Sequence, residues 1–88
     1  EVAVGDGGVP ADQDREAAFA AQEAAFDSGQ RRPWRGRHAY GYIDPGPEFT
    51  DTRGMCRNYT HRIYIDGRPR AAEGVACRGR DGVWRIVS

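Results

Sequence analysis

The feature that most constrains the fold of this chain is a pair of cysteines placed symmetrically about an Asp-Gly dipeptide. Asp66 and Gly67 separate two runs of strand-forming residues, and this dipeptide strongly favours a two-residue type I′ hairpin turn. Cys56 lies ten positions before Asp66, and Cys77 lies ten positions after Gly67. The two cysteines would therefore face each other across one antiparallel hairpin.

A proline gives an independent check of this register. The pair that closes the turn is hydrogen-bonded, so the next pair outward, Tyr64 with Pro69, is not. Pro69 has no N–H group and is tolerated at such a position. Cys56 and Cys77 fall on the same kind of pair, whose Cα atoms lie about 4.5 Å apart, within the range of a disulfide. The sequence therefore predicts a disulfide between them.

The predicted disulfide also indicates a compartment. Small domains often need a covalent staple, and disulfides persist in oxidising surroundings such as the periplasm, the outer membrane or the cell surface. The alternative for two cysteines is a redox or metal site. The chain has no C-x-x-C motif, and His38 and His61 show no ligand spacing. We therefore expect a structural disulfide and no metal or other cofactor.

Residues 11–28 are predicted to form a helix that packs on the sheet. Phe19 and Phe26 lie seven positions apart, and Ala18, Gln22 and Ala25 fall on the same side of the helix. Asp12 or Asp14 is suited to cap the first turn. The expected class is α+β: one N-terminal helix packed on a small antiparallel sheet of about four strands, with one disulfide.

The domain is expected to occupy residues 11–88. Residues 1–10 are rich in glycine and show no periodicity, which is typical of a flexible linker or tail. Aromatic residues alternate after Pro33, which predicts a strand with one shared face formed by Trp34, His38, Tyr40 and Tyr42. Residues 44–47 would end that strand, and residues 48–51 are a candidate short edge strand.

The last strand is predicted to begin at Val83, and its facing depends on the preceding loop. A two-residue Asp-Gly turn would place Trp84 and Ile86 on the Cys77 face. A three-residue loop with Gly82 in the left-handed region would place them on the opposite face. We favour the second arrangement because it gathers the large apolar residues into one core.

The charges are unevenly distributed. Residues 1–30 contain seven acidic residues and one arginine, whereas residues 31–88 contain 12 arginines and six acidic residues. One interpretation is a basic surface that binds an anionic partner. The other is that the acidic helix neutralises the sheet internally.

Five arginines are the candidate partner-binding residues. Arg68, Arg70 and Arg80 lie at hairpin tips and are favoured for contact. Arg57 and Arg78 follow the two cysteines. They either support the fold, by pairing with acids of the helix or stacking on an aromatic ring, or grip a carboxylate or phosphate of a partner.

The segments around the cysteines resemble the C-terminal domain of the 17 kDa surface antigen family, which are rickettsial-type outer-membrane lipoproteins. The motifs that carry the resemblance are Gly54-x-Cys56-Arg57-x-Tyr59, Ile65-x-Gly67-Arg68, Ala72-x-Gly74-x-Ala76-Cys77-Arg78 and Asp81-Gly82-x-Trp84-x-Ile86-Val87. The resemblance implies an envelope location and no known catalytic activity. Family members carry a lipidated cysteine and a glycine-rich segment before this domain, so any membrane association is expected only through an N-terminal anchor missing here.

These observations predict a non-catalytic binding or structural domain of the cell envelope. It would contact an envelope protein or an anionic envelope polymer through its arginine-rich surface. The alternative is a small periplasmic inhibitor or activator that docks on an envelope enzyme. No nucleophile elbow or phosphate-binding loop occurs, so no catalytic residue is expected. A disulfide and a formal net charge of zero argue against nucleic acid as a partner.

Overall fold

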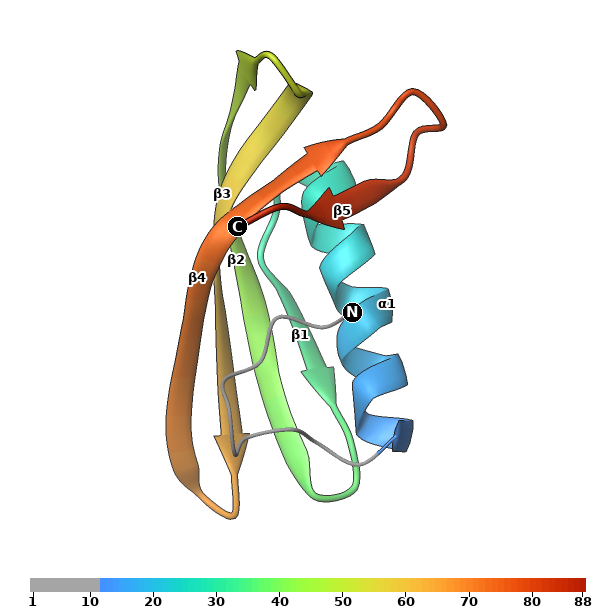
Figure 1. The fold of residues 1–88 in the computed structure, drawn as a ribbon. Coiled ribbons are helices and arrows are strands. Elements are labelled where there is room, and N and C mark those ends of the chain that lie inside the picture. The colour runs from blue at the N-terminus through green and yellow to red at the C-terminus, as the bar shows by residue number, and fades with distance from the viewer. Residues whose placement is uncertain (1–11) are drawn as a thin grey trace.

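The computed structural model describes residues 12–88, so the predicted linker lies outside the described residues. One helix lies against one face of a five-stranded antiparallel sheet, whose strands follow one another in chain order (Figure 1). The elements are α1 (Asp12–Ser28), β1 (Arg32–Arg35), β2 (Ala39–Asp51), β3 (Gly54–Ile65), β4 (Arg68–Arg78) and β5 (Trp84–Ile86). The predicted α+β class is confirmed, with five strands rather than about four. Within these residues, no helix has the length and apolar character needed to cross a membrane.

The additional strand arises where the sequence predicted a single one. The chain turns at residues 36–38 and separates β1 from β2. Trp34 is buried in the core, whereas Tyr40 and Tyr42 lie on the other face of the sheet, and His38 lies in the turn. The predicted shared face was therefore wrong. The prediction failed because the aromatic residues keep alternating through the turn. The alternation therefore did not reveal that the chain reverses there.

The proline-rich segment at residues 44–47 does not end a strand. β2 continues through it to Asp51, with a register shift between Pro45 and Glu48. A bulge leaves residues outside the hydrogen-bonded ladder, so a proline costs no ladder bond there. The predicted separate edge strand at residues 48–51 is consequently the end of β2.

The central hairpin has the predicted register. Cys56 pairs with Cys77 across β3 and β4, and the two form a disulfide with a Cα–Cα distance of 4.0 Å. Asp66 and Gly67 both have positive φ, at 52° and 75°, as a type I′ turn requires. The turn and disulfide predictions are both confirmed.

Reduction of the disulfide is expected to lower the free energy of unfolding by about 3 kcal/mol, because it removes a constraint on the unfolded chain. The measurement is urea denaturation of the oxidised protein, of the reduced protein and of a C56A/C77A variant. Intact mass before and after alkylation reports the oxidation state. Two alkylated thiols without added reductant, or identical unfolding curves, would contradict this assignment.

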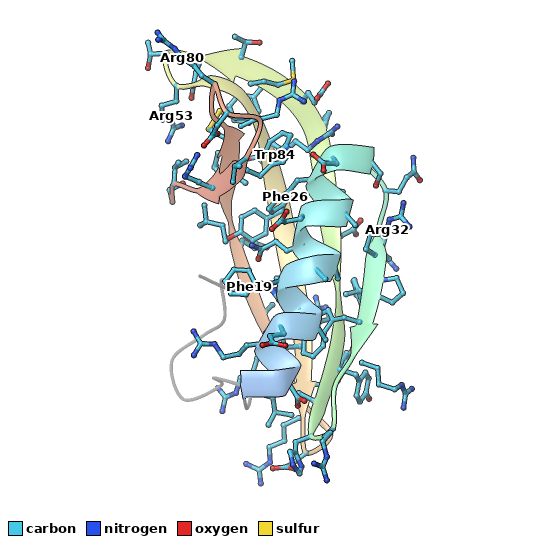
Figure 2. All side chains as sticks on the ribbon, turned by 90° about the vertical axis from the view of Figure 1, so that its right-hand side faces the viewer. Phe19, Phe26, Arg32, Arg53, Arg80 and Trp84 are labelled. Atoms are coloured by element: carbon cyan, nitrogen blue, oxygen red, sulfur yellow. A yellow bond between two sulfur atoms is a disulfide. The ribbon has the colours of Figure 1, made fainter. Side chains whose placement is uncertain are left out.

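α1 packs its small residues against the sheet and places one large ring at the centre of the core. Phe26 is only 1% exposed, whereas Phe19 is half-buried at the margin of the same cluster. Figure 2 shows both side chains on the same side of the helix. The other buried positions of the helix face are Ala18, Ala21, Gln22 and Ala25. The predicted burial is confirmed for Phe26 and is partial for Phe19.

The last strand joins this core in the arrangement that the sequence analysis favoured. Gly82 has a φ of 82°, and the N–H of Gly79 donates to the carbonyl of Val83 at 2.9 Å, which closes a three-residue loop. Trp84 pairs with Arg78 of β4 and is buried. The centroid of its ring lies 5.6 Å from that of Phe26.

Asp14 does not cap the helix but holds the β1–β2 turn. Its carboxylate is inaccessible to solvent and accepts the backbone N–H groups of Arg37 at 2.7 Å and His38 at 2.9 Å. A Cβ atom at Gly36 would lie 2.2 Å from this carboxylate, so the turn needs glycine there. One buried charge therefore fixes where the first hairpin sits on the helix.

A second polar contact lies within the core. Trp34 Nε1 donates to His61 Nε2 at 2.9 Å, and His61 is inaccessible to solvent. A nitrogen that accepts this bond carries no proton. His61 is thus a packed histidine of the sheet.

Candidate anion-binding surface

The arginines predicted at the hairpin tips lie at two ends of the molecule. Arg68 and Arg70 begin β4, next to the β3–β4 turn at the lower end of Figure 1. Arg80 lies in the β4–β5 loop at the other end, where Figure 2 also shows Arg53. The long dimension of the protein is 39 Å. These tips therefore do not form one compact site.

Arg57 is engaged inside the fold. Its side chain is 11% exposed, and its Nε donates to the carbonyl of Phe26, in the last turn of α1, at 2.9 Å. Its guanidinium also donates to the carbonyl of Gly46 at 2.9 Å and lies 3.4 Å from the Glu48 carboxylate. Carbonyls in the last turn of a helix lack intrahelical partners. These contacts favour the structural interpretation of Arg57.

Arg78 has a mixed position. Its side chain is exposed, with the guanidinium carbon 5.8 Å from the ring centroid of Trp84 and one nitrogen 3.6 Å from the sulfur of Met55. It therefore covers an aromatic ring and still presents its charge to solvent, as long cationic side chains commonly do.

The sheet register brings two turns together at the lower end. Ala39 pairs with Ile65, which in turn pairs with Arg68. The β1–β2 turn consequently lies beside the β3–β4 turn, because neighbouring strands are only about 4.8 Å apart. We call this end of the sheet the basic end; its members are Arg35, Arg37, His38, Arg68 and Arg70. By register, Arg35 lies on the face opposite α1, whereas Arg68 and Arg70 lie on the same face as α1.

The arginines of the basic end are not neutralised within the fold. Among residues 14–88, whose side chains the structure describes, the ion pairs are Arg31–Asp44, Arg53–Asp51, Arg57–Glu48 and Arg85–Asp81. None of them involves the basic end, and none joins a carboxylate of α1 to an arginine of the sheet. Direct ion pairing by the acidic helix therefore does not account for the excess of arginine in the sheet.

A small hollow lies within the basic end. It has a volume of about 360 Å³ and is lined by Ile65, Asp66, Arg68 and Arg70. A guanidinium group presents a planar set of donors that matches a carboxylate or a phosphate. The hollow has two guanidinium groups and one carboxylate, so its lining carries an excess of positive charge. It therefore suits an anionic group of a partner.

The sequence analysis missed two members of this cluster. Arg35 and Arg37 fell inside the single strand predicted there, so their closeness to the β3–β4 turn was not visible. Gly36 was the available signal, because a glycine within a strand pattern often marks an interruption. A turn placed at Gly36 would have predicted the β1–β2 hairpin. That hairpin brings Arg35 and Arg37 to the same end of the sheet as the β3–β4 turn.

Possible metal-ligating atoms also come together in one place. Within the described part of the chain, Oδ1 of Asp51 and the sulfur atoms of Cys56 and Cys77 lie within 4.8 Å of one another. The two sulfur atoms form the disulfide, and the ligand form of cysteine is the thiolate. We therefore assign this group of atoms to the structural disulfide.

Comparison with known proteins places the chain among surface antigens. No family model and no solved structure matches it. The curated relatives include the 17 kDa surface antigens of Rickettsia conorii, 35% identical over 83 residues, Rickettsia felis, 35% over 85, and Rickettsia prowazekii, 33% over 85; each match covers 88% of this chain. The chain belongs to the 17 kDa surface antigen family. It spans 52% of the length of these relatives, about half.

The residues that carry the family resemblance have structural roles in this surface antigen domain. The two cysteines form the staple, and Arg57 holds the end of the helix. Tyr59 and Trp84 pack on Phe26, with ring centroids 5.4 and 5.6 Å from its ring. The 17 kDa surface antigen motifs thus specify the core of the domain, whereas its exposed surface must be assigned from geometry.

Proposed function

We propose that this surface antigen domain is a non-catalytic binding domain of the cell envelope, which holds an anionic envelope polymer through its basic end. The observation that carries the proposal is that Arg35, Arg37, Arg68 and Arg70 lie at one end of the sheet and form no ion pair with residues 14–88. Guanidinium groups bind anions but stay protonated near neutral pH, so they suit binding rather than proton transfer.

Two observations support the location. The relatives bear the name surface antigen, and the disulfide between Cys56 and Cys77 fits an oxidising compartment. The periplasm, the outer membrane and the cell surface all meet that condition. We infer that the polymer carries carboxylate or phosphate groups, because guanidinium groups bind these anions in a bidentate manner.

The arrangement of charge favours a polymer over a small anion. Arg78 and Arg80 are exposed at the end of the molecule remote from Arg68 and Arg70. A chain with repeated anionic groups engages several separated guanidinium groups at once, which raises the overall affinity without new contacts. Such binding weakens as salt screens the exposed charges.

The test is co-sedimentation of the purified domain with isolated cell-wall sacculi and with vesicles of anionic lipid. Replacing Arg68, Arg70 and Arg80 with glutamine is expected to leave the melting temperature nearly unchanged and to weaken binding about tenfold or more, because charge-assisted contacts are lost. Wild-type binding should also fall as salt is raised. Arg85→Gln is the control for the loss of a single exposed arginine, since Arg85 is already paired with Asp81.

Two results would contradict this function. Unchanged binding together with a lower melting temperature would show that the tip arginines support the fold. Saturable binding to one envelope enzyme, with no retention by sacculi or vesicles, would instead favour an inhibitor or activator that docks on that enzyme.

A further inference from the structure

Three tyrosines form a hollow on the sheet face opposite α1. Tyr40 and Tyr42 of β2 and Tyr64 of β3 alternate with residues that point into the core. Together with Pro33 and Arg35 of β1, they line a hollow of about 710 Å³, which we call the tyrosine slot. This volume is within the range of small-ligand sites. Figure 1 shows that α1 lies against the other face of the sheet, so α1 does not cover the slot.

The walls of the slot are held in place before any ligand arrives. The rings of Tyr40 and Tyr64 are stacked, with centroids 5.0 Å apart and planes within 10°. The guanidinium of Arg35 lies 5.7 Å from the centroid of Tyr40, and that of Arg31 lies 4.4 Å from the centroid of Tyr42. Stacked rings and cation–π contacts limit side-chain motion, so less entropy is lost on binding.

The polar groups of the slot are available to a ligand. None of the hydrogen bonds in the described residues involves the hydroxyl groups of Tyr40, Tyr42 or Tyr64, and Arg35 has no carboxylate partner there. The slot therefore offers flat apolar walls, three hydroxyl groups and one unpaired positive charge. Its ligand should combine an apolar ring face with hydroxyl groups and a negative charge.

We propose that the tyrosine slot binds a carboxylated sugar ring. The C–H groups on one face of a sugar ring carry partial positive charge and are attracted by the negative face of an aromatic ring. The sugar hydroxyls would bond to the tyrosine hydroxyls, and its carboxylate would pair with Arg35. This inference rests on the proposed function, because it names an acidic glycan as the anionic polymer. Arg35 lines the slot and lies at the same end of the sheet as the basic end, so we expect one glycan chain to run from the slot around the β1–β2 turn.

The test is a titration of the ¹⁵N-labelled domain followed by NMR. The probes are an oligomer of galacturonic acid, its neutral methyl ester and inorganic phosphate. We expect the acidic oligomer to shift the amide signals of residues 34–35, 40–42 and 64, and to bind about tenfold more tightly than the ester. Phosphate should shift only the signals of residues 36–39 and 66–70.

Variants locate the interaction. Tyr42→Ala is expected to weaken binding of the acidic oligomer about tenfold, whereas Val83→Ala, which also trims an exposed apolar side chain, should have no effect. Arg35→Gln does not depend on repacking an aromatic ring. It should reduce the preference for the acid over the ester and leave the melting temperature unchanged.

The outcomes separate this inference from the proposed function. Shifts confined to residues 36–39 and 66–70 with every probe would refute the slot and leave the polymer-binding function standing. Shifts in the slot, combined with unchanged polymer binding by R68Q/R70Q, would refute that function and leave the slot standing. Tighter binding of a proline-rich peptide than of the acidic oligomer would overturn the choice of ligand.

Discussion

Replacing Phe26 with alanine is expected to lower the free energy of unfolding by about 3–5 kcal/mol, the range for removing a fully buried aromatic ring. Phe26 is 1% exposed, and its ring lies between those of Tyr59 and Trp84. The variant would leave a cavity where α1, β3 and β5 meet. The measurement is urea denaturation of the variant and the wild type, followed by circular dichroism.

Phe19→Ala is the matched control for this prediction. Phe19 lies on the same helix, one heptad earlier, and is only half-buried. Its removal should therefore cost clearly less than that of Phe26. A loss below about 0.5 kcal/mol for Phe26→Ala, which is typical of surface positions, would mean that α1 does not pack on the sheet as described.

Asp14→Ala is expected to destabilise the protein by about 4 kcal/mol. Its carboxylate accepts the backbone N–H groups of Arg37 and His38 in a site without solvent access. A buried donor left without an acceptor costs about 1–3 kcal/mol, and this variant orphans two. Denaturation of Asp14→Ala beside Glu16→Ala, which changes an exposed acid of the same helix, isolates this effect.

The same carboxylate should make stability depend on pH. Burial alone would raise the pKa of Asp14, but hydrogen bonds from the backbone N–H groups of Arg37, His38 and Ala39 outweigh burial and hold the pKa below the ordinary value of an aspartate. A lowered pKa in the folded state stabilises the protein above the unfolded value. That stability is lost as the pH falls through the folded pKa. Asp14→Asn should remove this part of the acid sensitivity. If the free energy of unfolding of the variant and of the wild type depended on pH in the same way between pH 6 and about pH 2, the assignment would be contradicted.

The features that could be predicted from sequence are those set by local rules. A dipeptide that requires positive φ determined the position of the β3–β4 turn, and counting outward from it paired Cys56 with Cys77. Small residues around Phe26 determined the buried face of the helix. The β1–β2 turn was missed because it is stabilised by Asp14, more than 20 residues away in the chain. No local pattern reports such a contact.

The residues of the candidate site also divide into those that local rules predict and those that depend on the tertiary structure. Arg68 and Arg70 were predicted to be exposed because they follow a turn of known type. The role of Arg57 depends on where the end of α1 lies over the sheet, which is a tertiary property. Tyr40 and Tyr42 were assigned to the face of Trp34, since a missed turn of three residues places the following positions on the wrong side of the sheet.

The most direct test of the central claim is to map where a soluble, anionic fragment of the cell wall contacts the ¹⁵N-labelled domain. We predict that the amide signals of residues 36–39 and 66–70 shift together and saturate with one affinity. The shifts should shrink as salt is raised. Signals around Arg53 and Arg80 should move less at low ligand concentration. Saturable shifts confined to that opposite end, or none at any concentration, would contradict the claim that the basic end holds the polymer.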